Sequence, residues 1–251
     1  MKYLTPLVVI ALVAFTGFAT YLFIPEQVED CCEYIGLLAP EGVSETPGQE
    51  HVDFAGASED GSIPATLPGL KLNDTPGEIS LPDIDGVMHT IDYRAKKLTV
   101  IVWVSSFCPT SKIYEERLNT LAADFAGNAQ FYGINSSAME SLQELKDHYH
   151  DGDPDRLKLT VLKDDRNVLA DRFGARVSAE VFVLDHEGRL QYRGGIDDAR
   201  NPSRVTVQYL RVVLEQLAAG SEPEWHYQPA KGCCPIDRVD PIEQKPGPQK
   251  S

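Results

Sequence analysis

Two spacings of apolar residues alternate along residues 79–219, one typical of strands and the other of helices. Residues 98–105 form a near-continuous apolar run rich in β-branched side chains, which predicts a central strand buried on both faces. Apolar residues then recur at helical spacing up to Gly127, where the helix is expected to end: Tyr114, Leu118, Leu121 and Phe125. The chain thus passes directly from a buried strand into an amphipathic helix.

The same alternation continues on both sides of this pair. Residues 79–89 predict a hairpin of two short strands, and residues 130–136 predict the strand after the first helix. Ser137 and Glu140 have the spacing of a capping box, which indicates a second helix with an inner face of Leu142, Leu145 and Tyr149. The remaining predicted elements are a short apolar segment at 157–162, a short helix at 167–173 closed by Gly174, a hairpin over 181–193 and a final helix over 203–219.

This order predicts an α/β fold, with a central mixed sheet flanked by helices on both faces. The last two strands are expected to be antiparallel, because a short turn joins them. The plan is that of a thioredoxin-like fold with an N-terminal hairpin extension. Trp103, on the central strand, is expected to lie in the core.

The N-terminus has a different composition. Residues 4–24 contain no charged side chain, and a run of this length can cross a hydrocarbon core as a helix. Lys2 precedes the run and acidic residues follow it, so the positive-inside tendency places the rest of the chain outside the cytoplasm. A signal peptide cleaved after Ala19 is the alternative. We therefore expect residues 1–24 to be a membrane anchor or signal sequence, and the soluble domain to be extracytoplasmic (periplasmic, if bacterial).

The net charge is −15, from 38 acidic and 23 basic residues. This balance argues against a nucleic-acid partner, because phosphate binding needs surplus Lys and Arg. Ten acidic residues and no Lys or Arg lie between Pro25 and Thr66. Their composition predicts a flexible acidic stalk over residues 25–65, with a docking site for a basic partner as the alternative. The folded domain is expected at 66–220, and residues 221–251 form a Pro-rich tail containing Cys233 and Cys234.

Cys108 combines several features of a reactive thiol. It follows the buried strand, and Pro109 begins the helix, a favoured position for proline. The positive end of the helix dipole stabilises a thiolate there and lowers the pKa of the thiol, and Lys112 adds a nearby positive charge. The alternative is an inert buried cysteine. We expect a reactive one, because Cys108 lies at the carboxyl end of the central strand.

Several segments, in the helix after Cys108 and further along the chain, are typical of one known family. They are residues 108–112, residues 114–118, "DDRNVLADRFG" at 164–174, "EVFVLD" at 180–185, "YRGGIDD" at 192–198, and Gly232-Cys233. Together they resemble the redoxin (AhpC/TSA-like) branch of the thioredoxin-fold superfamily over about residues 62–236. The resemblance implies a thiol-dependent oxidoreductase with disulfide-exchange or antioxidant activity, without cofactor or metal, acting on a protein disulfide or thiol or on peroxide. The site residues that it implies are Ser105, Cys108, Pro109, Thr110 and Ser111.

Ser111 stands where a dithiol oxidoreductase of this fold has its second cysteine. Serine cannot resolve a mixed disulfide, so a resolving thiol must come from elsewhere. Cys233 or Cys234 is the first candidate, because the tail can fold back, and Cys31 or Cys32 is the second. The two cysteine pairs can instead tie the stalk to the tail. Five cysteines are an odd number, which leaves a free thiol or a disulfide-linked dimer open.

Ser178-Ala179-Glu180 stands where related redoxins have Thr-Pro-Glu with a cis-proline. A cis bond before a residue other than proline is costly, so a trans bond is expected before Ala179.

Two other functions remain open. In a peroxiredoxin-like peroxidase Ser105 would orient peroxide, but Ile101 and Ala179 stand where an upstream Pro and an activating Arg are expected, and Arg176 is only near the second place. In a non-catalytic redox-sensing or metal-binding module, the cysteine pairs and His226 would ligate copper or zinc. Four further polar residues are expected to be solvated or to serve loops and caps: His148, His150, Asp197 and Asp198.

Overall fold

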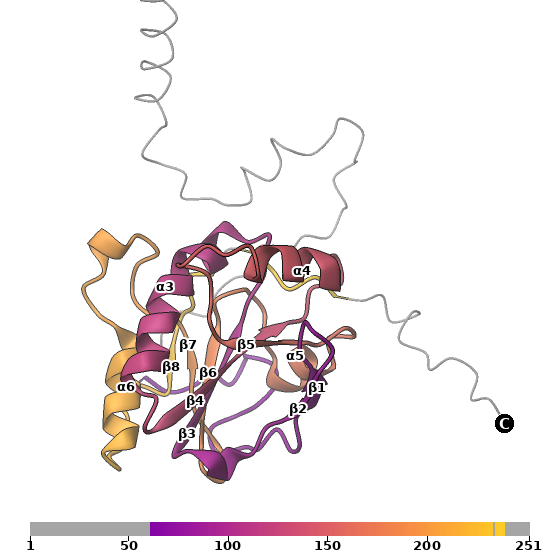
Figure 1. Cartoon of the computed structure of the whole chain (residues 1–251). Helices are drawn as coiled ribbons and strands as arrows, with labels where there is room; N and C mark the ends of the chain where they lie inside the picture. Colours follow the sequence, from indigo (N-terminus) through magenta and orange to yellow (C-terminus); the bar gives the residue numbers. More distant parts are fainter. Residues whose placement is uncertain (1–60, 233, 239–251) are drawn as a thin grey trace, which may run out of the picture. The chain divides into compact units, whose positions relative to one another are not determined.

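The computed structural model describes residues 61–232 and 234–238 (Figure 1). The predicted anchor, most of the stalk, and Cys31, Cys32 and Cys233 lie outside the described residues. Within the described ranges, no helix combines the length and the hydropathy of a membrane span.

A six-stranded mixed sheet forms the centre of the molecule, in the order β5-β4-β3-β6-β7-β8. β3 pairs in parallel with β4 and antiparallel with β6, and β6 and β7 form the expected antiparallel hairpin. The strands are β3 (Leu98–Trp103), β4 (Ala129–Asn135), β5 (Thr160–Lys163), β6 (Val181–Asp185), β7 (Leu190–Gly194) and β8 (Tyr227–Gln228). The predicted N-terminal hairpin is confirmed as the antiparallel pair β1 (Ser80–Pro82) and β2 (Met88–Thr90).

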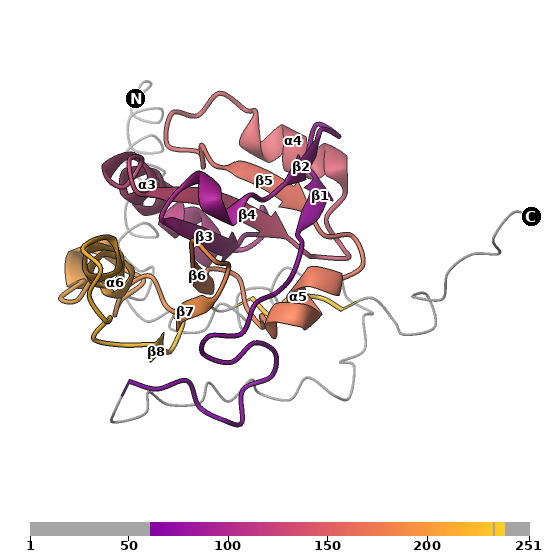
Figure 2. The same cartoon turned by 90° about the horizontal axis from the view of Figure 1, so that it is seen from below.

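Helices cover both faces of the sheet, as the alternation of elements predicted. The helices are α3 (Pro109–Asp124), α4 (Leu142–Tyr149), α5 (Val168–Phe173) and α6 (Tyr209–Ala218), with two 3-10 turns, η1 (Tyr93–Ala95) and η2 (Pro202–Arg204). One apolar cluster packs α3, α4 and α6 against one side of the sheet, and the other packs α5 against the opposite side. Figure 2 shows α3 and α5 on opposite sides of β3 and β6.

All six residues of β3 are buried, which confirms the central strand expected from its apolar run. Trp103 packs against Phe173 and Phe182, with ring centroids 5.3 and 5.2 Å away, so the expectation that it lies in the core is also confirmed. Its indole N–H donates to Ser136 at 3.0 Å, which satisfies the one polar group that burial of the ring would otherwise leave unpaired.

The second helix begins differently from the prediction. The capping box is formed by Ser141 and Glu144, not by Ser137 and Glu140. The reason is that both predicted residues are used elsewhere: Glu140 accepts two hydrogen bonds from Ser106, and Ser137 contacts Asp237. Leu145 and Tyr149 are buried as expected, but Leu142 at the first turn is 43% exposed.

The final helix is shorter than residues 203–219, because α6 starts at Tyr209. Asp198 accepts hydrogen bonds from the N–H and hydroxyl of Thr206, and its own N–H donates to Val207. These bonds hold residues 205–207 outside the helix, beside the loop after β7. β8, within the range assigned to the tail, pairs in parallel with β7 and so belongs to the sheet.

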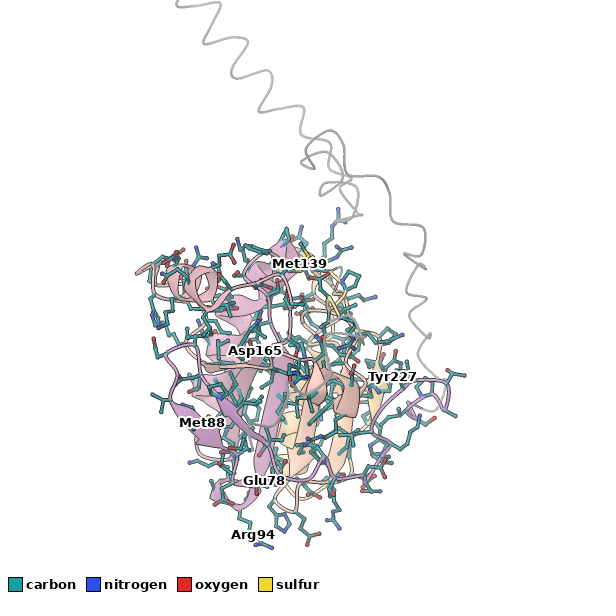
Figure 3. All side chains as sticks on the ribbon, turned by 90° about the vertical axis from the view of Figure 1, so that its right-hand side faces the viewer. Glu78, Met88, Arg94, Met139, Asp165 and Tyr227 are labelled. Atoms are coloured by element: carbon teal, nitrogen blue, oxygen red, sulfur yellow. The ribbon has the colours of Figure 1, made fainter. Side chains whose placement is uncertain are left out.

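Figure 3 places Met139, after β4, at one end of the molecule and Arg94, before β3, at the other. The carboxyl ends of the parallel strands β3 and β4 therefore face the end marked by Met139. The loop that leads from β3 to Cys108 lies there as well.

Candidate active site

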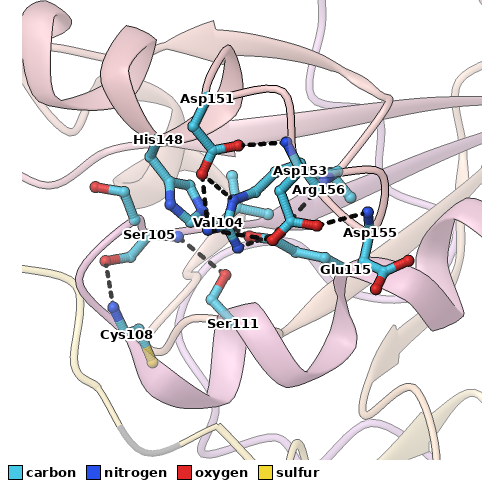
Figure 4. Close-up of polar contacts among 12 residues, drawn as sticks. Val104, Ser105, Cys108, Ser111, Glu115, His148, Asp151, Asp153, Asp155 and Arg156 are labelled. Carbon is cyan, nitrogen blue, oxygen red and sulfur yellow. Dashed lines mark hydrogen bonds and ion pairs between the residues drawn. The ribbon is translucent and has the colours of Figure 1, made fainter.

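Cys108 is the N-cap residue of α3 (Figure 4). Pro109 is the first helical residue, as the sequence predicted. Two hydroxyl groups shape the loop before the thiol. The Ser105 hydroxyl oxygen accepts the backbone N–H groups of Phe107 and Cys108, both at 3.2 Å, and the Ser111 hydroxyl accepts the N–H of Ser105 at 3.1 Å. Ser105 and Ser111 thus fold the loop over the start of the helix, while Cys108 itself is fully buried.

The tail brings Cys234 beside Cys108. A hydrogen bond from the Cys234 thiol is the main cause that lowers the pKa of Cys108 to about 6. Burial acts in the opposite direction, and backbone N–H groups of Ser111 and Thr110 at the helix N-terminus lower the pKa further. Neither sulfur is in a disulfide. The site therefore contains a stabilised thiolate with a second thiol within hydrogen-bonding distance.

Ala179 lies on the loop before β6, next to the active-site strand. Its peptide bond is trans, as expected, since none of the described peptide bonds is cis. It adopts a left-handed conformation with φ of 64°, and its N–H donates to the carbonyl of Trp103 at 2.7 Å. An alanine rarely takes this conformation, so the surrounding contacts must hold it there.

A buried ion pair supplies those contacts. Arg193 on β7 donates to Glu180 at 2.8 Å and to the carbonyl of Gly174 at 2.9 Å. The other carboxylate oxygen of Glu180 accepts the backbone N–H of Arg176 at 2.8 Å. Together these bonds hold both ends of residues 174–180 and so fix the loop that carries Ala179.

A second buried carboxylate holds the loop before the thiol. Glu140 accepts hydrogen bonds from the backbone N–H and the hydroxyl of Ser106, at 2.7 and 2.6 Å. Lys163 on β5 donates to the Glu140 carbonyl at 3.0 Å and to Asn135 and Ser137, and burial lowers the pKa of this lysine. The loop after β4 is thereby tied to the loop that carries Cys108.

His148 is not solvated, contrary to the expectation from its place near a polar helix end. Its side chain is 9% exposed and its Nε2 lies 2.8 Å from Glu115, a buried acid on α3. Glu115 also accepts the backbone N–H of Leu157 at 3.3 Å, and Arg156 lies 3.7 Å from it (Figure 4). The fold of the loop after α4 over α3 buries this pair, which a helix-end position in the sequence does not reveal. His150 is exposed and lies 3.6 Å from Asp85.

Asp197 has a larger role than a loop or cap residue. It is buried, and it accepts hydrogen bonds from Tyr114 and Arg117, both on α3. Burial raises the pKa of Asp197, although these two donors act to lower it. Asp197 therefore anchors the active-site helix to the end of β7, whereas Asp198 forms the loop contacts expected of it.

The remaining predicted residues are only partly brought together. Thr110 is buried in the first turn of α3, while Lys112 is exposed. His226 lies 2.8 Å from the Gln191 carbonyl and 3.1 Å from Glu222. In the part of the chain that the structure describes, no three potential ligands gather around a common point to hold a metal ion.

Sequence reasoning missed the supporting acids Glu140, Glu180 and Glu115. Glu180 and Arg193 lie within the segments that resemble the redoxin family, at 180–185 and 192–198. The available signal was the type of residue: a charged side chain directly beside a buried apolar strand needs a partner. The identity of each partner depends on contacts between elements far apart in the chain.

Comparisons with known proteins agree with this architecture. The AhpC/TSA family matches residues 70–193. A hypothetical protein from Sinorhizobium meliloti 1021 is 27% identical, with a TM-score of 0.61 over 68% of this chain and 96% of that chain. An uncharacterized conserved protein from Geobacillus kaustophilus is 25% identical, with a TM-score of 0.60 over 72% of this chain and 98% of that chain. No curated protein matches. The AhpC/TSA match and the thioredoxin-like sheet place the domain at residues 70–193 in the redoxin branch of the thioredoxin-fold superfamily.

Proposed function

We propose that this protein is a thiol–disulfide oxidoreductase in which Cys108 is the attacking thiol and Cys234 the resolving thiol. One observation carries the proposal: the Cys234 thiol donates a hydrogen bond to Cys108 and lowers its pKa to about 6. A thiol with this pKa is largely ionised at pH 7, and the thiolate is the nucleophile in disulfide exchange. Ser111 cannot resolve a mixed disulfide, so the neighbouring thiol takes that role.

The reaction has two exchange steps. The Cys108 thiolate attacks one sulfur of a substrate disulfide, forms a mixed disulfide and releases the other substrate sulfur as a thiolate. Cys234, after losing its proton, attacks the Cys108 sulfur and releases the second substrate thiolate. Two electrons pass from the protein to the substrate, and a Cys108–Cys234 disulfide remains. An external dithiol must reduce it before the next turnover.

Oxidation with a small excess of glutathione disulfide, followed by disulfide mapping, tests this proposal. The parent is expected to form Cys108–Cys234. The Cys234→Ser variant is expected to accumulate a glutathione adduct on Cys108, while Cys233→Ser, a matched control at the adjacent residue, should behave as the parent does. A Cys108–Cys233 bond, or no adduct on Cys108, would refute the assigned pair.

Hydrogen peroxide is the second substrate class to be compared. Attack of the Cys108 thiolate would give a sulfenic acid and hydroxide, and condensation with Cys234 would release water and form the same disulfide. Rates of Cys108 oxidation by equal concentrations of peroxide and a small disulfide distinguish a peroxidase from a disulfide oxidoreductase. Faster oxidation by the disulfide supports the function proposed here, and much faster oxidation by peroxide favours the peroxidase.

We also propose that the reaction takes place outside the cytoplasm, with the domain held at the membrane through residues 4–24. The uncharged apolar run, preceded by Lys2, supports this location. In cells that express the full chain, the protein should remain in the membrane fraction after alkaline extraction. An impermeant thiol reagent applied to intact cells should label it, if the outer envelope admits the reagent, and should not label a cytoplasmic control.

A further inference from the structure

Residues 234–238, here called the strap, pair with the loop before β6 as a short added strand. The Ser178 N–H donates to the Cys234 carbonyl at 3.0 Å, and the Ile236 N–H donates to the Arg176 carbonyl at 2.9 Å. Between them, Val177 and Pro235 form an antiparallel bridge. The strap therefore occupies the main-chain groups of residues 176–178 that would otherwise remain available to another extended chain.

Side chains beyond the ladder hold the far end of the strap. The Asn167 amide donates to the Asp237 carbonyl at 2.9 Å, and the Ser137 hydroxyl lies 3.2 Å from the Asp237 carboxylate. Arg238 donates to the Ala175 carbonyl at 2.5 Å and lies 3.4 Å from Asp171. The ion pair is exposed on both sides, and exposed pairs contribute little to stability. The strap is thus held by main-chain hydrogen bonds, by a few polar side chains, and by the packing of Ile236 against the apolar cluster around α5.

Gly232, two residues before the strap, packs tightly against the same loop. Gly232 lies so close to the loop that a Cβ atom on it would be 2.0 Å from the Ser178 carbonyl oxygen and 2.8 Å from a Val177 methyl group. No real Cβ atom tolerates such a contact with backbone, so any side chain here must displace the strap or the loop. This glycine offers a way to open the strap without altering either thiol.

Because Cys108 is buried, the position of the strap can affect how a substrate reaches its thiol. The side chain has no exposed surface, although Phe107, the preceding residue, is 54% exposed. A pocket of about 340 Å³ between α3 and α6 is lined by Ile113, Arg117 and Arg211 and does not include Cys108. A substrate sulfur must reach the thiolate itself, and Cys234, the first residue of the strap, lies against that thiol.

We propose that the strap is a lid that gates Cys108: closed, it excludes bulky disulfides, and it must swing away from residues 176–178 before a protein substrate reacts. This inference extends the proposed redox function, because the lid carries the resolving thiol. After a substrate has reacted, return of the lid delivers Cys234 to the mixed disulfide. The Cys108–Cys234 bond then holds the lid closed until it is reduced.

The test uses alkylating reagents of two sizes on a full-length chain in which Cys31, Cys32, Cys233 and Cys234 are Ser, so that Cys108 is the single thiol. Iodoacetamide and a 5-kDa polyethylene glycol maleimide are compared, and the ratio of their rates is the readout. Gly232→Ala is expected to raise the relative rate of the bulky reagent by about tenfold or more, which corresponds to about 1.4 kcal/mol of lid closure. Gly127→Ala is the matched control, because a Cβ atom there meets nothing within 4 Å.

A second variant protects the test against misfolding of Gly232→Ala. Ile236→Pro removes the N–H that donates to Arg176 and leaves the packing at Gly232 unchanged. It is expected to raise the same ratio, and hydrogen exchange at the Ser178 amide should become faster in both variants. A parent whose rate ratio equals that of both variants, with a rapidly exchanging Ser178 amide, would overturn the lid. Since no oxidation is involved, this outcome is independent of whether a Cys108–Cys234 disulfide forms.

Discussion

Arg193 and Glu180 form an ion pair at 2.8 Å, with their side chains 0% and 2% exposed. Arg193 also stacks over the Phe182 ring, 4.8 Å from its centroid. The pair joins β7 to the loop before β6, on which Ser178 contacts the strap and Ala179 contacts the active-site strand. The geometry around Cys108 therefore depends on a charge pair two strands away.

Removal of one partner should expose this dependence. Arg193→Met leaves the buried Glu180 carboxylate without its cation, and the free energy of unfolding is expected to fall by about 3–5 kcal/mol. Urea unfolding followed by circular dichroism measures the loss. Arg189→Met, directly before the same strand, removes the more exposed pair with Asp185 and should cost no more than about 1 kcal/mol. Equal losses in the two variants would show that the buried pair does not organise the loop.

Because Ala179 is in a left-handed conformation, two substitutions at this position are expected to change stability in opposite directions. Ala179→Gly removes the steric conflict of the Cβ atom and should leave stability unchanged or increase it by up to about 1 kcal/mol. Ala179→Pro is expected to destabilise by about 3 kcal/mol or more, because proline requires a negative φ and lacks the N–H that donates to Trp103. Thermal and urea unfolding of the three proteins measure the order, and a stable Ala179→Pro variant would contradict the described loop.

The Cys234 thiol should control the titration of Cys108. In the reduced parent, the rate of iodoacetamide labelling at Cys108 is expected to rise with a midpoint near pH 6. Cys234→Ala removes the largest stabilising contact, so the midpoint should move toward the ordinary thiol value and labelling at pH 7 should slow. Cys233→Ala serves as the control. An identical midpoint in the parent and in Cys234→Ala would show that the Cys234 thiol does not lower the pKa of Cys108.

The same shift predicts how stability depends on pH. The folded-state pKa of Cys108 is lower than its unfolded-state value, so ionisation favours the folded protein. This contribution is absent below about pH 6, grows as the pH rises, and is fully present above the ordinary pKa of a thiol. The difference in unfolding free energy between the reduced parent and Cys108→Ser should therefore increase from pH 6 to pH 9. A difference that does not change with pH would contradict a depressed pKa.

His148 and His150 offer a comparison of a buried and an exposed histidine on neighbouring positions of one helix end. His148→Leu removes the hydrogen-bond partner of the buried Glu115 and should lower the free energy of unfolding by about 1–3 kcal/mol. His150→Leu, at an exposed position, should change it by no more than about 0.5 kcal/mol. Denaturant unfolding at pH 7 checks both values. If His150→Leu lowered the free energy of unfolding as much as His148→Leu, the buried contact between His148 and Glu115 would not be the cause of the loss.

The sequence by itself determined the order of the elements, the central strand and the place of Cys108 at a helix N-terminus. Each of these depends on local properties: the spacing of apolar residues, the preference of proline for the first turn, and the peptide dipoles of one helix. The same local signals misplaced a capping box. Ser137 and Glu140 have the required spacing, but Asp237 and Ser106, far away in the chain, compete for them.

Only the tertiary structure decided which groups surround the thiol. Four cysteines were candidates to resolve Cys108, and spacing could not choose among them. The position of Cys234 beside Cys108 depends on strand-like pairing between residues 176–178 and 234–236, about sixty residues apart in the chain. Burial likewise turned Glu115, Glu140, Glu180 and Asp197 into paired groups, because a charge removed from water must find a partner wherever the fold supplies one.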